Sequence, residues 1–100
     1  MNQTAETEAP LQAALTDASQ RTGVALAALK VVGVERVTWP DGSLGCPAPD
    51  RLYTQALVPG YRIRIDANGD LLDYHASLHG APSQCPPGRV RPPLNDKARM

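Results

Sequence analysis

A turn signal at Asn68-Gly69 lies between two segments of alternating polar and apolar residues and leaves few folds open to this chain. Asn and Gly most readily adopt the positive φ angles of a type I′ turn, which joins two antiparallel strands. Every second residue on either side is apolar, as in a half-buried strand; these residues are Tyr61, Ile63 and Ile65 before the turn and Leu72, Tyr74 and Ala76 after it. The sequence therefore predicts a hairpin with strands at residues 61–66 and 71–76.

An amphipathic helix is predicted ahead of this hairpin, from Glu8 to Arg21. Its apolar residues fall at the i, i+3, i+4, i+7 spacing of one helix face; they are Leu11, Ala14, Leu15 and Ala18. Pro10 suits the first turn, and Gly23 suits the position just past the end. Residues 30–39 are rich in Val and Thr and predict a third strand, with a bulge at Gly33.

These elements predict an α+β fold, in which the helix packs on a small three-stranded, or slightly larger, antiparallel sheet. One hundred residues are enough for one hydrophobic core. We expect a flexible N-terminus at residues 1–7, a single α+β domain at 8–85 and a flexible, proline-rich basic tail at 86–100. A long loop rich in proline and glycine spans residues 40–60.

The charge balance argues against nucleic acid as a partner, because ten basic and ten acidic residues give a net charge of zero. No stretch approaches the roughly 20 apolar residues that span a bilayer, so we expect no membrane insertion. Residues 1–10 are polar and do not resemble a signal peptide. We expect a monomer whose partner, if there is one, is a protein.

Two cysteines, Cys46 in the long loop and Cys85 in the tail, flank the hairpin. A disulfide between them would anchor the two segments that are least able to hold themselves in place. Two free thiols are the alternative, because spacing alone does not prove the pairing. A bridged pair indicates a periplasmic or extracellular protein, and a reduced pair a cytoplasmic one.

The sequence contains parts of several metal-binding and catalytic patterns, but each lacks some of the residues or surroundings that the pattern needs. Cys46, His75, His79 and Cys85 could form a zinc set, but neither cysteine belongs to a Cys-x-x-Cys pair. Asp66, Asn68 and Asp70 start like a calcium loop but lack its later ligands. Ser43 falls outside a Gly-x-Ser-x-Gly elbow, and a Cys46, His75 and Asp73 triad would have little to exclude water. We expect no metal, no cofactor and no catalysis.

The long loop is the remaining candidate site. Prolines and a disulfide at its base would reduce the entropy that it loses on docking, as in rigid binding loops and many protease inhibitors. The possible interaction residues are Pro47, Pro49, Arg51, Leu52 and Tyr53. The alternative is structural, with Leu52, Tyr53 and Leu57 packed over one end of the sheet.

Residues 37–47, which read V-T-W-P-D-G-S-L-G-C-P, resemble a family of short uncharacterised bacterial proteins, as do P-G-Y-R-I at 59–63 and Tyr74-His75. Members look like exported or lipid-anchored domains with a second cysteine near the C-terminus, where this chain has Cys85. This chain departs from the pattern at Asp50, where the family usually has Gly, and in lacking a visible export signal. More loosely, a helix followed by a meander is similar to PepSY-type domains, some of which are linked to peptidase inhibition.

The resemblance and the residues together predict a small binding domain of the bacterial envelope or exterior, without catalysis. The alternative is a small protease inhibitor that acts through residues 47–59.

Overall fold

The predicted hairpin forms the centre of the structure, a computed structural model that describes residues 3–94, with side chains from residue 6 onward. Its strands are β2 (Val58–Ala67) and β3 (Asp70–Ser77). Asn68 and Gly69 have φ angles of 58° and 101°, as a type I′ turn requires. The Asp66 carboxylate accepts a hydrogen bond from the Gly69 backbone N–H at 2.7 Å, which closes the turn.

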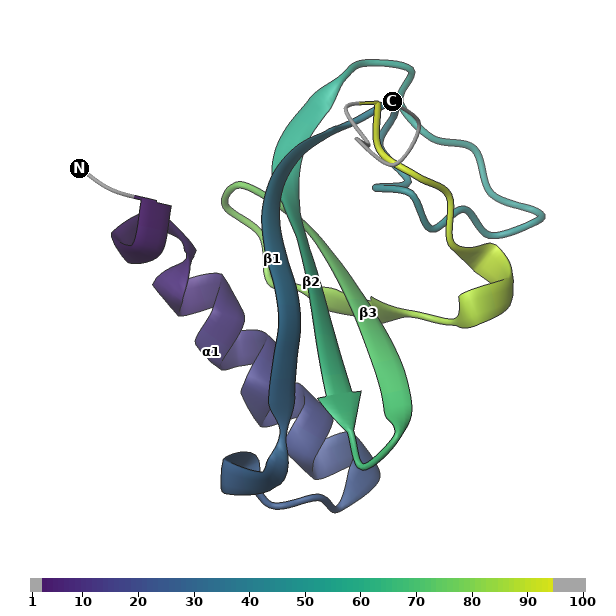
Figure 1. Ribbon diagram of the computed structural model, residues 1–100. Coiled ribbons are helices and arrows are strands. Elements are labelled where there is room, and N and C mark those ends of the chain that lie inside the picture. Colours follow the sequence, from purple (N-terminus) through teal and green to yellow (C-terminus); the bar gives the residue numbers. More distant parts are fainter. Residues whose placement is uncertain (1–2, 95–100) are drawn as a thin grey trace.

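Two further strands extend the hairpin into an antiparallel sheet with the order β1-β2-β3-β4 (Figure 1). β1 (Lys30–Trp39) pairs with β2, and the short β4 (Ser83–Cys85) pairs with β3. The register between β1 and β2 shifts between Val31 and Gly33, which confirms the predicted bulge. The predicted α+β class is confirmed, with four strands in the sheet.

The helix α1 (Gln3–Thr22) covers one face of the sheet and crosses β2 and β3 (Figure 1). Its small residues Ala14 and Ala18 are fully buried, so the helix backbone lies close to the strands. The buried cluster contains Ala14, Ala18, Tyr61, Ile63, Ile65 and Tyr74, with Leu11 and Leu15 packed against it. The predicted apolar helix face therefore faces the sheet, as the 3.6-residue period requires.

The start of the helix differs from the prediction, because α1 begins at Gln3 rather than near Glu8. Pro10 therefore lies inside the helix and not in its first turn. A proline inside a helix has no N–H to donate to the carbonyl four residues earlier. Local helix propensity therefore favours a start near Glu8, which would place Pro10 in the first turn. The end is as predicted: Gly23 has a φ of 79°, and its N–H donates to the Ser19 carbonyl at 2.8 Å.

Two tyrosines link the sheet to the helix through their hydroxyl groups. The Tyr61 hydroxyl donates to Glu6 at 2.9 Å, and the Tyr74 hydroxyl donates to Asp17 at 2.7 Å. Burial and the neighbouring Asp17 carboxylate raise the pKa of Tyr74 well above its ordinary value. Both tyrosine rings are therefore buried in the core, and both hydroxyl groups have a hydrogen-bond partner.

The proline-rich C-terminal segment also differs from the expectation of a flexible tail that starts at residue 86. It forms the 3₁₀ turn η2 (Pro87–Arg89) and then runs back along the long loop. The Arg91 N–H donates to the Gly45 carbonyl at 2.8 Å, and the Leu94 N–H donates to the Thr38 carbonyl at 2.9 Å. The prolines keep this segment out of longer helices and strands. Its Arg91 and Leu94 amides instead donate hydrogen bonds to carbonyls of the loop and of β1. Residues 1, 2 and 95–100 lie outside the described residues.

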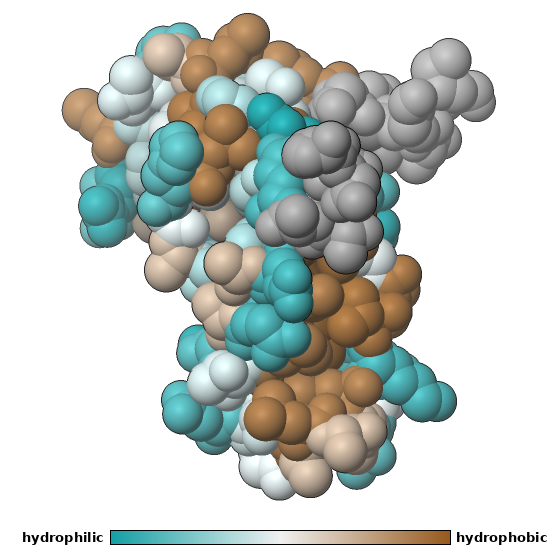
Figure 2. Space-filling model, turned by 90° about the vertical axis from the view of Figure 1, so that its left-hand side faces the viewer, coloured by the Kyte–Doolittle hydropathy of each residue, from teal (hydrophilic) through white to brown (hydrophobic). Residues whose placement is uncertain are grey.

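The end of the molecule away from the long loop is apolar. Leu26 of the 3₁₀ turn η1 (Leu26–Ala28) and Val32 of β1 are each 55% exposed. Figure 2 shows the side that carries α1, and several hydrophobic residues, coloured brown, lie toward this end of the molecule at the bottom of the view. Within the described part of the chain, no helix is long and apolar enough to cross a membrane.

Candidate functional site

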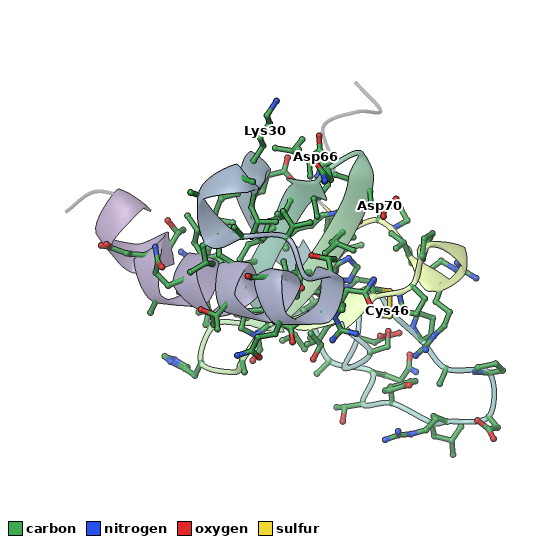
Figure 3. The ribbon with its side chains drawn as sticks, turned by 90° about the horizontal axis from the view of Figure 1, so that it is seen from below. Lys30, Cys46, Asp66 and Asp70 are labelled. Carbon is green, nitrogen blue, oxygen red and sulfur yellow. A yellow bond between two sulfur atoms is a disulfide. The ribbon has the colours of Figure 1, made fainter. Side chains whose placement is uncertain are left out.

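The candidate site is the long loop (residues 40–57), which leaves the sheet between β1 and β2 and extends away from the helix (Figures 1 and 3). Residues at its base form what we call the platform; Trp39, Gly45, His75 and Cys85 are buried, and Cys46 is half-buried. We call residues 48–53 the tip. The platform determines where the tip points, so it is described first.

The disulfide predicted between Cys46 and Cys85 is present, with their Cα atoms 5.9 Å apart. It joins the long loop to β4, the short strand at the edge of the sheet (Figure 3). Cys85 is fully buried. A disulfide is typical of proteins that fold in an oxidising environment, so its presence is informative about compartment.

The first turn of the loop is stabilised by Asp41. Its carboxylate accepts hydrogen bonds from the Ser43 hydroxyl at 2.6 Å and from the Ser43 N–H at 2.9 Å. These two bonds lower the pKa of Asp41 below its ordinary value. Asp41 and Ser43 in the segment 37–47 therefore form an Asx-type turn.

Gly45 is required because the loop passes close against the indole of Trp39. A Cβ atom at Gly45 would contact the Trp39 ring and would lie 2.7 Å from the Arg91 carbonyl oxygen. Its φ angle of 73° is also unfavourable for other residues. Trp39 is fully buried, and its indole N–H donates to the Ala76 carbonyl at 3.1 Å. The loop base is therefore packed directly on the sheet.

His75 connects the loop to the sheet through both of its ring nitrogens. Nδ1 lies 2.6 Å from the Leu44 carbonyl oxygen, and Nε2 lies 3.0 Å from a carboxylate oxygen of Asp73. Both oxygens are acceptors, so the two contacts are hydrogen bonds when both nitrogens carry a proton. The ring is 2% exposed and stacks on Trp39 with a centroid separation of 4.5 Å.

Asp73 and Arg62 complete this network with a bidentate ion pair. Arg62 Nε and Nη2 donate to the two Asp73 carboxylate oxygens at 3.2 and 2.9 Å, and both side chains are 14% exposed. Burial alone would raise the pKa of Asp73, but hydrogen bonds and charge from His75 and Arg62 lower it to about 2. The Asp73 carboxylate thus accepts three hydrogen bonds, two from Arg62 and one from His75.

Acid should weaken this network. A carboxyl group whose pKa is lower in the folded state stabilises the protein above its unfolded pKa of about 3.9. It loses that contribution as the pH falls through the folded value of about 2. We expect Asp73 to contribute about 2 kcal/mol to the free energy of unfolding near neutral pH, and to lose this between about pH 4 and pH 2.

Urea unfolding at a series of pH values measures this contribution. Asp73→Asn keeps the shape of the side chain and removes the titrating group, so the difference between the variant and the wild type isolates Asp73 from the other acidic residues. An Asp73→Asn protein that loses stability in acid as steeply as the wild type would contradict the assignment.

The arrangement of the platform bears on the sites considered from the sequence. Cys46 and Cys85 are joined to each other, so Cys46 has no thiol to act beside His75 and Asp73. Among residues 3–94, no group of three or more His, Cys, Asp or Glu side chains is arranged to hold a metal ion. The disulfide through Cys46 instead attaches the loop to β4.

The tip is bonded within itself, and the loop on either side of it is held at its base. The Gly42 N–H donates to the Thr54 carbonyl at 2.8 Å, and the Ala48 N–H donates to the Tyr53 hydroxyl at 3.0 Å. Arg89 Nε donates to the Pro47 carbonyl at 3.2 Å. These bonds close the loop at its base and across its width.

Of the predicted interaction residues, Leu52 is the most prominent, because it is 99% exposed. Leu57 is 63% exposed as well, so Leu52 and Leu57 do not pack over the sheet as the alternative required, whereas its third residue, Tyr53, is half-buried. The Arg51 guanidinium lies over the Tyr53 ring, 5.9 Å from its centre. Pro47 is half-buried next to the platform, and Pro49 is exposed in the turn before Arg51.

Sequence reasoning missed Arg89 and the structural roles of Asp73 and His75. Arg89 lies in the segment expected to be a tail, yet it lines a pocket of about 230 Å³ together with Ser43 and His75. The alternation around Tyr74 places Asp73 and His75 on the face of the sheet away from the helix. The alternation predicts on which face of the sheet these two side chains lie. It does not predict that the long loop covers that face.

Comparison with known proteins gives a family without an assigned activity. No curated protein and no solved structure matches this chain. The model of one family matches residues 11–85, which include the helix face, the platform and the long loop. By this match, the chain belongs to the family described as a domain of unknown function, DUF8738.

Proposed function

We propose that this protein is a small non-catalytic binding module that docks on a protein partner through the tip of its long loop. The observation that carries the proposal is the contrast between the buried platform and the exposed tip. Leu52 is 99% exposed, although the loop on either side of it is held by hydrogen bonds and a disulfide.

Preorganisation is the physical reason. A mobile loop loses conformational entropy when it docks, whereas a loop that is already held in one shape loses less. The platform devotes a disulfide and a buried Trp39–His75 stack to holding this loop. An isolated apolar side chain at the end of such a loop is well placed to act as an anchor in a partner's pocket.

We further propose that the module works in the bacterial envelope or outside the cell. The disulfide supports an oxidising compartment, because thiols are kept reduced in the cytosol. The same bridge supports a non-catalytic role, since it removes the thiol that a cysteine nucleophile would need.

Site-specific photo-crosslinking tests the docking surface. A photoreactive residue at position 52 should give a discrete adduct with one envelope or secreted protein. The matched control is position 26, where Leu26 of η1 is also apolar and exposed. The η1 turn lies at the other end of the molecule from the long loop (Figure 1). We expect an adduct from position 52 and none from position 26, with the position-52 adduct lost when the disulfide is reduced.

Two results would contradict the proposal. An adduct from position 26 alone would place the docking surface at the apolar end near η1. Equal, diffuse labelling from both positions would show that the tip has no specific partner.

A further inference from the structure

The tip offers two side chains to a partner, Arg51 and Leu52, and the structure distinguishes them. The Arg51 guanidinium lies over the ring of Tyr53, an arrangement that a cation favours. Leu52 has no such contact and exposes nearly its whole surface to water. Burial of Leu52 in an apolar pocket would recover hydrophobic free energy, whereas insertion of Arg51 would first break its contact with Tyr53.

The chain on both sides of the Leu52–Tyr53 peptide bond is held by hydrogen bonds within the loop, and on the N-terminal side also by the disulfide to β4. On the N-terminal side, the Arg51 N–H donates to the Ala48 carbonyl at 3.3 Å, and the disulfide holds Cys46. On the C-terminal side, the Tyr53 hydroxyl accepts from the Ala48 N–H, and the Thr54 carbonyl accepts from Gly42. Residues 51–55 belong to neither a helix nor a strand.

Resting on the proposed function, we infer that the partner is a peptidase with an apolar primary specificity pocket, and that Leu52 enters this pocket. Peptidases bind chain segments that are free of secondary structure and accessible from one side, which the tip provides. If the enzyme hydrolyses the Leu52–Tyr53 bond, one water is consumed and a carboxylate and an amine form. Both new ends remain tethered, so the cleaved protein stays in the pocket and inhibits.

Inhibition of purified peptidases tests this inference. The wild-type protein should inhibit a chymotrypsin-type or subtilisin-type enzyme at about equimolar protein, and should not inhibit a trypsin-type enzyme. Leu52→Gly should weaken inhibition by at least about 100-fold, as expected for loss of a central anchor. Leu52→Arg should transfer inhibition to the trypsin-type enzyme, because that pocket prefers a basic side chain.

Arg51→Ala is the matched control on the same tip, and we expect it to change inhibition by less than about 5-fold. Leu52 is fully exposed, so its variants should fold as the wild type does, which circular dichroism can verify.

Rapid cleavage after Leu52 without inhibition, or inhibition that survives Leu52→Gly, would overturn the inference. A specific position-52 adduct with a protein that is not a peptidase would overturn it too, while leaving the binding module intact. Failure of the proposed function would instead remove the position-52 adduct itself.

Discussion

Replacing both Cys46 and Cys85 by alanine is expected to lower the free energy of unfolding by about 4 kcal/mol. The two cysteines are 39 residues apart, and a cross-link over a loop of this length removes about that much conformational free energy from the unfolded chain. Small domains are stable by only about 5–15 kcal/mol, so the loss is a large fraction of the total. Urea denaturation of the variant beside the oxidised wild type measures it.

The loss should appear first in the segments that the bridge joins. Hydrogen exchange of the reduced protein should show faster exchange at the Gly42 and Arg91 amides, which hold the loop to its neighbours. Amides between β2 and β3 should keep most of their protection, because their pairing does not depend on the loop. A decrease of less than about 1 kcal/mol, or equal loss of protection throughout, would contradict this role for the disulfide.

The second large effect is expected for Trp39→Ala, which should lower the free energy of unfolding by about 3–5 kcal/mol. Trp39 is fully buried and packs between the His75 ring and the backbone at Gly45. Its removal leaves a cavity beneath the loop and takes away the indole donor to the Ala76 carbonyl. Thermal or urea unfolding of the variant gives the change.

Leu52→Ala is the control for Trp39→Ala, because Leu52 is the most exposed apolar residue of the same loop. We expect its free energy of unfolding to stay within about 0.5 kcal/mol of the wild type. If Trp39→Ala were as mild as Leu52→Ala, the loop would not depend on the platform. If Leu52→Ala were strongly destabilising, the tip would be structural rather than a docking surface.

The hairpin and the helix face could be predicted because their signals are local. Asn68-Gly69 specifies its turn through the φ angles that these two residues tolerate, and alternation on either side sets which residues face the core. The pairing of Cys46 with Cys85 followed from the weakness of the segments that carry them. The hairpin and the helix face each needed only neighbouring residues and one physical rule.

The helix start and the tail could not be predicted, because their outcome depends on distant contacts. Pro10 and Glu8 favour a start near residue 8, yet the helix extends to Gln3, and Glu6 in that extension bonds to Tyr61 of β2. The proline-rich segment after Cys85 has no regular pattern of its own. Its position comes from the carbonyls of Gly45 and Thr38, which lie far away in the sequence.

By itself, the sequence determined the hairpin, the strand before the long loop and the inner face of the helix, because backbone preferences and apolar periodicity act within a few residues. Only the tertiary structure decided the hydrogen bonds under the loop: His75 and Asp73 carry no local signal that the Leu44 carbonyl and Arg62 will become their partners. It also decided that Leu52 points into solvent while Tyr53 is held across the loop. The physical reason is that a side chain's burial and hydrogen-bond partners depend on which distant segments fold against it, and no local pattern records that choice.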